Sequence, residues 1–353
     1  MKSLFSEYEF LEYKFPPPQY LGAKYRFRAW IHEYLPRNAH TAVDAFGGSQ
    51  SIAYYFKQLG MSVYSNDLMA YSDAIGVGLV ENTAEQLTAE DLQLLFSENP
   101  DPSYYDLMQR EFTDVFFRED DTAFIDAFRG NADRISSRIK KSLALAVMNR
   151  ALTRKVTMGH FAHLRALAYA DDPMRVKRNR SLVRPVRDLF LDLVSEYNSA
   201  VFDNRMHCES HRGDAATYIS ELKDVDVAYF DPPYGNSHAD YQQFYHLLET
   251  YTEYWKDKKF VNGVHRYEPR RETLFDQKST VVQALNSLFA SAEHIPCWIV
   301  SYNDRSYPDE AALVEIVQKY RNAKVVHKAY DESRGGKGSV AGSSEILIIG
   351  ERK

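Results

Sequence analysis

The sequence predicts an α/β protein whose sheet is interrupted by a mostly helical insertion. Short apolar runs typical of buried strands alternate with helical patterns in residues 1–75 and again in residues 206–353. In residues 76–205 the strand signals fade, and amphipathic runs predict helices instead. We therefore expect one sheet domain built from the two outer ranges, with the middle range inserted between its second and third strands.

The first outer range has the pattern of a βαβ unit. Residues 41–46 predict a strand that ends at the Gly47-Gly48 turn, and residues 51–59 predict a helix that Gly60 ends. Residues 62–65 predict a second strand, which closes on Asp67. This order favours parallel strands with a ligand site at their carboxyl ends.

The second outer range returns to strands and finishes with two strands in succession. The predicted elements are a strand before Asp214, a strand at 225–230, a helix at 280–292, a strand at 296–302, a helix at 310–320, and strands at 324–330 and 345–350. Residues 332–343 between the last two strands predict a glycine-rich turn. Because no helix separates these strands, we expect a terminal antiparallel hairpin.

Composition excludes several classes of protein. The chain of 353 residues is 44% hydrophobic and 26% charged, which is ordinary for a globular protein. No apolar run approaches the ~20 residues of a membrane span, and the N-terminus lacks a signal-peptide core. The two cysteines form no disulfide framework, and the eleven histidines show no metal spacing. We expect a cytoplasmic protein without a metal site or a membrane partner.

The first βα turn predicts a nucleoside site. Asp44, Phe46, Gly48 and Ser49 surround a turn where glycine lets a ligand approach the backbone, and Asp67 is suited to ribose hydroxyls. The turn has no lysine for a phosphate cradle, so a nucleoside without phosphates is favoured, and S-adenosylmethionine fits that description. A Gly-Gly turn alone is equally compatible with a structural role.

The sequence Asp231-Pro232-Pro233-Tyr234 follows the strand at 225–230 and stops it abruptly. Two prolines remove two N–H donors, which leaves carbonyls free at the carboxyl end of the strand. An acid, free carbonyls and an aromatic ring can together hold a planar amino group. The alternative is a strand-ending turn with a buried tyrosine.

Asp214, in Arg212-Gly213-Asp214-Ala215, has two interpretations. Its carboxylate can accept a hydrogen bond from the amino group of a cofactor adenine, or it can cap the helix predicted to follow.

A basic stretch within the insertion predicts contact with a polyanion. Between Arg134 and Arg187 the chain carries fourteen Lys and Arg residues, and its acids there are Asp171 and Asp172, although the whole protein has a net charge of −6. Such asymmetry favours a surface that faces phosphates. The alternative is a solvated helical face.

These motifs resemble the N6-adenine DNA methyltransferases of the group that includes DNA adenine methylase and the D12 class. Tyr20-Leu21-Gly22-Ala23-Lys24 resembles the family's N-terminal motif, and residues 44–49 resemble its D-x-F-x-G-x-G cofactor loop. Asp67 resembles the ribose-binding position, and residues 231–234 match the catalytic motif in full. Tyr241 and residues 246–250 and 301–303 also resemble family segments. The resemblance covers residues 20–75 and 205–350, and Gln50 departs from it where the loop's last glycine is expected.

The resemblance implies a Rossmann-like methyltransferase sheet that binds S-adenosylmethionine through Tyr20, Lys24 and the loop. It implies that an adenine is flipped out of duplex DNA and that Tyr234 stacks on this base. Asp231 and the Pro232 carbonyl would then hold its N6 atom. It also implies a modification enzyme of a restriction-modification or related defence system, with a cognate restriction endonuclease as a possible partner. A side chain at Gln50 is expected to narrow the cofactor pocket or to lower cofactor affinity.

The insertion is the candidate for target recognition. The predicted DNA contacts are Arg138, Lys141, Arg154, Lys155, Arg175, Lys177, Arg178 and Arg180, with Arg270 and Arg271 near the catalytic motif. One alternative is an RNA amino-group methyltransferase, which would share the sheet and the tetrapeptide. A second is an inactive DNA-binding protein, which Gln50 makes conceivable. The recognition sequence and the oligomeric state do not follow from the sequence.

Overall fold

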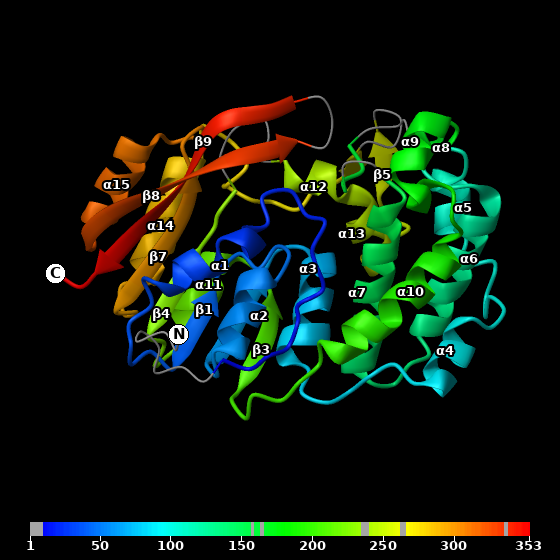
Figure 1. The fold of residues 1–353 in the computed structure, drawn as a ribbon, viewed down its shortest axis with the longest axis horizontal. Helices are drawn as coiled ribbons and strands as arrows, with labels where there is room; N and C mark the ends of the chain where they lie inside the picture. The colour runs from blue at the N-terminus through cyan, green and yellow to red at the C-terminus, as the bar shows by residue number, and fades with distance from the viewer. Residues whose placement is uncertain (1–9, 157–158, 163–165, 234–239, 262–265, 335–337) are drawn as a thin grey trace.

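The computed structural model describes residues 10–156, 159–162, 166–233, 240–261, 266–334 and 338–353 (Figure 1). Its centre is a seven-stranded sheet in the order β3-β2-β1-β4-β7-β9-β8. The strands are β1 Thr41–Asp44, β2 Ser62–Asp67, β3 Cys208–Arg212, β4 Val227–Phe230, β7 Cys297–Asn303, β8 Asn322–Arg334 and β9 Gly338–Glu351. The first five strands in the spatial order run parallel, whereas β9 is antiparallel to both β7 and β8. The predicted mixed α/β sheet and terminal hairpin are confirmed.

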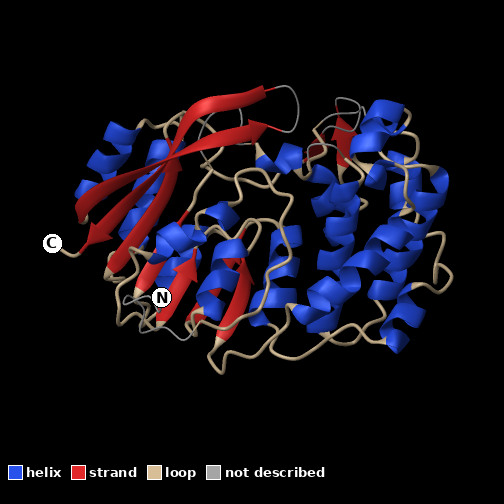
Figure 2. Ribbon diagram, in the orientation of Figure 1, coloured by secondary structure: helices blue, strands red, loops and turns tan. Residues whose placement is uncertain are grey.

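Helices cover both faces of the sheet, as Figure 2 shows. Alternate strand residues face opposite sides: Ala42 and Tyr229 join one core cluster, and Val43 and Phe230 join the other. The first cluster includes apolar side chains of α2 Ser51–Gln58, and the second includes those of α11 Ala215–Glu221, α14 Val281–Ser291 and α15 Glu310–Gln318. The sheet is therefore buried on both faces, as a mostly parallel sheet requires.

The chain between β2 and β3 is helical, as predicted. After α3 Ala70–Ile75 come η2 Gly76–Glu81, α4 Ala89–Leu95, α5 Leu107–Phe112, α6 Glu119–Ala132, α7 Arg138–Arg154, α8 Ala166–Ala170, α9 Pro173–Arg178, η3 Arg180–Leu182 and α10 Val186–Ser199. The apolar side chains of this bundle belong to the same cluster as those of α2. The insertion consequently shares its core with one face of the sheet.

Six further elements complete the described part of the chain. They are η1 Lys24–Arg26, α1 Arg28–His32, α12 Tyr241–Phe244, α13 His246–Glu253 and the small antiparallel pair β5 Lys259–Val261 and β6 Arg266–Glu268. Among the described residues, no helix is long and apolar enough to cross a membrane.

The terminal hairpin is longer than the sequence predicts. Strands β8 and β9 extend into the range 332–343, which the glycine content assigned to a turn, and a register irregularity lies between Tyr330 and Glu332. Pairing between two backbones does not depend on side-chain pattern, so the glycine-rich composition hid the extra length.

Candidate active site

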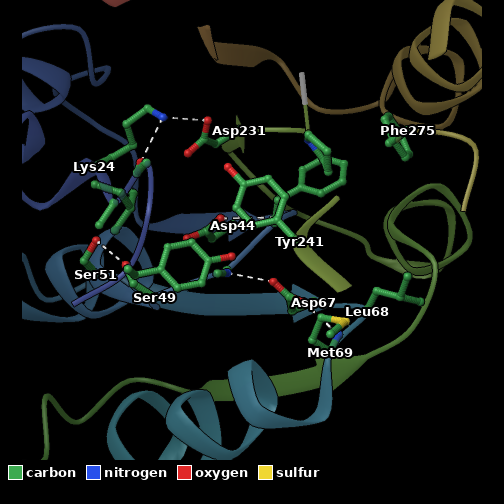
Figure 3. A pocket seen from close by; sticks show the side chains of 18 of the residues that line it. Lys24, Asp44, Ser49, Ser51, Asp67, Leu68, Met69, Asp231, Tyr241 and Phe275 are labelled. Atoms are coloured by element: carbon green, nitrogen blue, oxygen red, sulfur yellow. Dashed lines mark hydrogen bonds and ion pairs between the residues drawn. The ribbon is translucent and has the colours of Figure 1, made fainter. Parts of the chain in front are cut away.

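A pocket lies at the carboxyl ends of β1, β2 and β4, and most of the predicted catalytic and cofactor-binding residues line it (Figure 3). Its lining includes the predicted residues Tyr20, Lys24, Asp44, Phe46, Gly48, Ser49, Asp67, Asp231 and Pro233. These come from four separate stretches of the chain that the sheet topology brings to one edge. Pro232 is buried beside the pocket.

The β1–α2 turn forms the floor of the pocket. The buried carboxylate of Asp44 accepts hydrogen bonds from the backbone N–H groups of Phe46 (3.3 Å) and Ala53 (3.2 Å), which ties the strand end to the helix. Burial raises the pKa of Asp44 to about 8. Asp44 therefore has a structural role in shaping the turn as well as a place in the lining.

Gly48 allows the turn to approach an aromatic ring. Its φ is +49°, and a Cβ built there would lie 3.3 Å from the Tyr20 ring. The Gly48 N–H donates to Asp67 Oδ2 at 2.7 Å, while the Met69 N–H donates to Asp67 Oδ1 at 2.8 Å. Asp67 thus joins the end of β2 to the turn, and burial raises its pKa.

Gln50 corrects one expectation from the sequence. Its side chain is fully buried and points away from the lining of the pocket: its Oε1 accepts from Ser65 Oγ at 2.5 Å, and its Nε2 donates to Ser72 O at 3.3 Å and Oγ at 3.2 Å. The prediction that this side chain narrows the pocket is wrong. The backbone conformation explains why the family has a glycine at this position: Gln50 adopts φ +63°, a left-handed conformation that favours glycine.

The upper part of the pocket holds a buried ion cluster. Lys24 Nζ lies 2.9 Å from Asp231 Oδ1 and 3.4 Å from Glu345 Oε1, and it also donates to Gly22 O at 3.2 Å. Although burial alone would lower the pKa of Lys24, the carboxylates of Asp231 and Glu345 raise it well above its ordinary value. Figure 3 shows Lys24 and Asp231 pointing toward one another, on the opposite side of the pocket from Asp67 and Met69.

Aromatic rings form one wall of the pocket. Tyr20 stacks on Tyr245 with ring centroids 4.7 Å apart and on Tyr241 at 5.8 Å, and the Leu21 N–H donates to the Tyr245 hydroxyl at 2.6 Å. Phe275 forms another part of the lining. Its ring packs edge-on against Phe46, with ring centroids 5.1 Å apart. The sequence assigned no site role to Tyr245 or Phe275, because aromatic residues are frequent throughout the chain.

Arg270 and Arg271, the two predicted DNA contacts near this wall, form ion pairs with carboxylates of the protein itself. Arg270 pairs with Asp240 at 2.9 Å and with Asp276 at 2.7 Å. Arg271 pairs with Glu249 at 3.0 Å and with Glu253 at 3.7 Å. Because Asp276 lines the pocket, Arg270 fixes part of its rim.

The basic residues of the insertion fall into two groups. Lys155 is buried, and its ammonium group contacts Asp121 at 2.9 Å and the Arg184 carbonyl at 2.7 Å, so its side chain is not available for the predicted DNA contact. Arg138 pairs with Glu81 at 2.5 Å, Lys141 pairs with Asp133 at 2.6 Å, and Arg154 is half-buried.

The second group is the exposed α9 cluster, which consists of Arg175, Lys177, Arg178 and Arg180. Arg175 lies 3.5 Å from Asp172, and its guanidinium stacks 3.8 Å from the centroid of the Tyr169 ring. Figure 1 places α9 at the edge of the bundle toward which the parallel strands point. Helix α9 therefore lies on the same side of the molecule as the pocket.

Asp214 and Tyr234 are the remaining predicted site residues. Asp214 caps α11 by accepting from the Thr217 N–H at 2.9 Å, is exposed, and is not part of the pocket lining, which supports its structural interpretation. Tyr234 lies outside the described residues. Within the described ranges, no group of three or more His, Cys, Asp and Glu side chains is arranged to hold a metal ion.

The mostly parallel sheet, the glycine turn after β1 and the acids at the ends of β1, β2 and β4 define a Rossmann-like methyltransferase. Residues 20–316 match the family model of the D12 class N6 adenine-specific DNA methyltransferases. The chain belongs to this family and is an adenine-specific DNA methyltransferase. The match includes the insertion, which the motif resemblance did not cover.

Individual relatives agree with this family. The chain is 27% identical over 349 residues to the type II methyltransferase M2.HphI of Haemophilus parahaemolyticus, with 96% of this chain and 99% of the relative covered. It is 21% identical to the type II methyltransferase M.CviAII of Paramecium bursaria Chlorella virus 1, with 88% and 92% covered. It is also 21% identical to the modification methylase StsI of Streptococcus sanguinis, with 86% of this chain and 46% of that relative covered.

Proposed function

We propose that this enzyme transfers a methyl group from S-adenosylmethionine to the N6 atom of an adenine that is flipped out of duplex DNA. The observation that carries this proposal is the single pocket that joins the β1–α2 turn and Asp67 to Asp231 and Pro233. A methyl donor at the first part and an amino group at the second would be adjacent, which is the proximity that methyl transfer needs.

The chemistry of the lining fits S-adenosylmethionine. Asp44 and Asp67 supply two carboxyl groups beside the glycine turn, and the lysine among the described lining residues, Lys24, is paired with Asp231 and Glu345. Such a lining favours a ligand with hydroxyl groups and positive charge over one with phosphates. We propose that Asp67 and the turn hold the ribose end and that Tyr20 contacts the cofactor. When bound, this cofactor supplies a methyl group that is already activated by a sulfonium.

The protein's own residues would orient the amino group. We propose that the Asp231 carboxylate and the Pro232 carbonyl accept hydrogen bonds from N6, which directs the nitrogen lone pair at the methyl carbon. Transfer of the methyl group to N6 would leave the nitrogen with one proton to lose, and that proton would pass to the Asp231 carboxylate and from there to solvent. Tyr234 is our candidate for stacking on the flipped base.

The α9 cluster is our candidate for holding DNA phosphates. Its four side chains are exposed, and helix α9 lies on the pocket side of the molecule (Figure 1), so we propose that each cation faces a phosphate without breaking a buried pair. Arg138, Lys141 and Arg154 are secondary candidates, since their present carboxylate partners or partial burial compete with DNA.

The names of the relatives favour a role in modification. Two are type II methyltransferases and one is a modification methylase, so we propose a restriction-modification enzyme that acts in the cytoplasm beside a cognate endonuclease. Family membership disfavours the RNA alternative. The absence of Gln50 from the pocket lining weighs against the inactive alternative.

The test is incorporation of labelled methyl groups from S-adenosylmethionine into unmethylated genomic DNA, with structured RNA as a parallel substrate. The wild-type protein should yield N6-methyladenine in DNA, and Asp231→Ala should abolish it while DNA binding is retained. Methylation by Asp231→Ala at the wild-type rate, or a methylated RNA in place of DNA, would contradict the proposal.

A further inference from the structure

Glu345 is a buried acid that the proposed chemistry leaves unassigned. It lies on β9 in register with Asn303 of β7, and its side chain is 2% exposed. The residues that follow it, Ile346 to Ile349, are apolar and buried. A carboxylate in such surroundings is costly unless it is paired, so its partners indicate what it does.

Two groups hold Glu345 in one orientation. Ser301 Oγ on β7 donates to Glu345 Oε1 at 2.7 Å, and Lys24 Nζ lies 3.4 Å from the same oxygen. Lys24 then reaches Asp231 Oδ1 at 2.9 Å. A continuous chain of contacts therefore runs from Ser301 through Glu345 and Lys24 to the acid at the end of β4.

The positive and negative charges in this series of contacts do not balance. One ammonium group is shared by two carboxylates, so the cluster carries a net charge of −1 when both acids are ionised. Burial raises the pKa of Glu345 to about 7, so this charge is present above neutral pH. If Glu345 were neutral, Lys24 would balance Asp231 completely. Lys24 is 4% exposed, so water screens these charges poorly and the difference would be felt at the adjacent part of the pocket.

The proposed reaction moves positive charge from the methyl donor to the amino nitrogen as the new bond forms. A net negative cluster beside that nitrogen favours the transition state over the ground state, which is the condition for a faster chemical step. Glu345 would supply this advantage without touching either substrate.

We propose that Glu345 is a positioning residue for methyl transfer: by sharing Lys24 with Asp231, it fixes the Asp231 carboxylate and keeps a net negative charge beside the amino group. This inference rests on the proposed function of the same pocket. The competing explanation is that Glu345 only anchors β9 to β7 through Ser301, a role that a neutral side chain of the same shape could fill.

The variant that separates these explanations is Glu345→Gln, which keeps the shape and a hydrogen-bond acceptor but removes the charge. Glu351→Gln is the matched control, because Glu351 lies on the same strand but is exposed. Methyl transfer to unmethylated genomic DNA should show kcat reduced between about tenfold and about a hundredfold in Glu345→Gln, by the size of a charge interaction at partly screened distances. The KM for S-adenosylmethionine should change less than about threefold, and the control should match the wild type.

The route through Lys24 is tested by a double-mutant cycle with Lys24→Met. If Glu345 acts through Lys24, adding Glu345→Gln to Lys24→Met should lower kcat by less than about twofold further. A fully additive loss would overturn that route. Wild-type kcat in Glu345→Gln would overturn the inference as a whole.

Stability is followed by thermal unfolding of each variant. If Glu345→Gln unfolds at the assay temperature, Ser301→Ala replaces it, since this change keeps both charges and removes one hydrogen bond; unchanged kcat with unchanged KM in that variant would count against positioning. Inactivity of the wild-type protein would refute the proposed function itself. If the wild type is active and Asp231→Ala is inactive, the proposed function holds, and the result for Glu345→Gln then tests the role of Glu345 alone.

Discussion

Replacement of Gln50 should separate the cost of a strained backbone from the value of a buried amide. Gln50 adopts φ +63°, which costs a residue other than glycine about 1 kcal/mol. Its side chain makes three hydrogen bonds to Ser65 and Ser72, each worth about 1 kcal/mol net.

Gln50→Ala loses the hydrogen bonds and keeps the strained backbone, so the free energy of unfolding should fall by about 3 kcal/mol. Gln50→Gly loses the same bonds but relieves the backbone, so its loss should be about 2 kcal/mol. The wild type should be the most stable of the three proteins, and the glycine variant should be more stable than the alanine variant.

Urea unfolding of the three proteins measures these differences, and calorimetry measures their affinity for S-adenosylmethionine. Affinity should change by less than about threefold, because the Gln50 side chain does not line the pocket. Equal stability of the alanine and glycine variants would refute the backbone argument. A tenfold gain in affinity on removal of the side chain would refute its placement away from the pocket.

Three further outcomes follow from burial and charge. Because burial raises the pKa of Asp44 from 3.8 to about 8, the folded protein keeps a proton that the unfolded chain loses; the free energy of unfolding should fall as pH rises from about 4 to about 8, and urea unfolding of Asp44→Asn should show a shallower fall. Lys155→Met should reduce stability by about 3 kcal/mol, because it leaves the Asp121 carboxylate unpaired, and an unchanged melting temperature would speak against this. Arg178→Ala should leave stability unchanged but weaken DNA binding and lower the slope of log affinity against log salt by about 1, measured by fluorescence anisotropy; an unaltered slope would remove Arg178 from the interface.

The sequence was sufficient for features that depend on local pattern. The apolar runs around Val43 and Tyr229 predicted strands, and the ends of those strands predicted where Asp44 and Asp231 would meet. This works because the carboxyl ends of neighbouring parallel strands share one edge of the sheet, whatever lies between them in the chain.

Features that depend on the partner of a side chain could not be predicted. Lys155 and Arg178 are both basic residues of the same stretch, yet one is buried against Asp121 and the other is exposed. Gln50 lies in the loop that we propose for the cofactor, but the direction of its side chain is set by Ser65 and Ser72, which follow it by 15 and 22 residues. A count of charges or a motif position contains no information about such directions.

The contact between Lys24 and Glu345 joins residues near opposite ends of the described chain. Between them lie the βαβ unit, the whole helical insertion and strand β4, which Asp231 follows. Contacts of such high sequence separation carry a loop-closure cost, and during synthesis this one cannot form until Glu345 has been made. During synthesis, an N-terminal portion of this protein could fold its turn after β1 well before the acid cluster exists. Catalytic competence would then arrive as one of the last events of folding, after the basic surface that we propose for DNA is already formed.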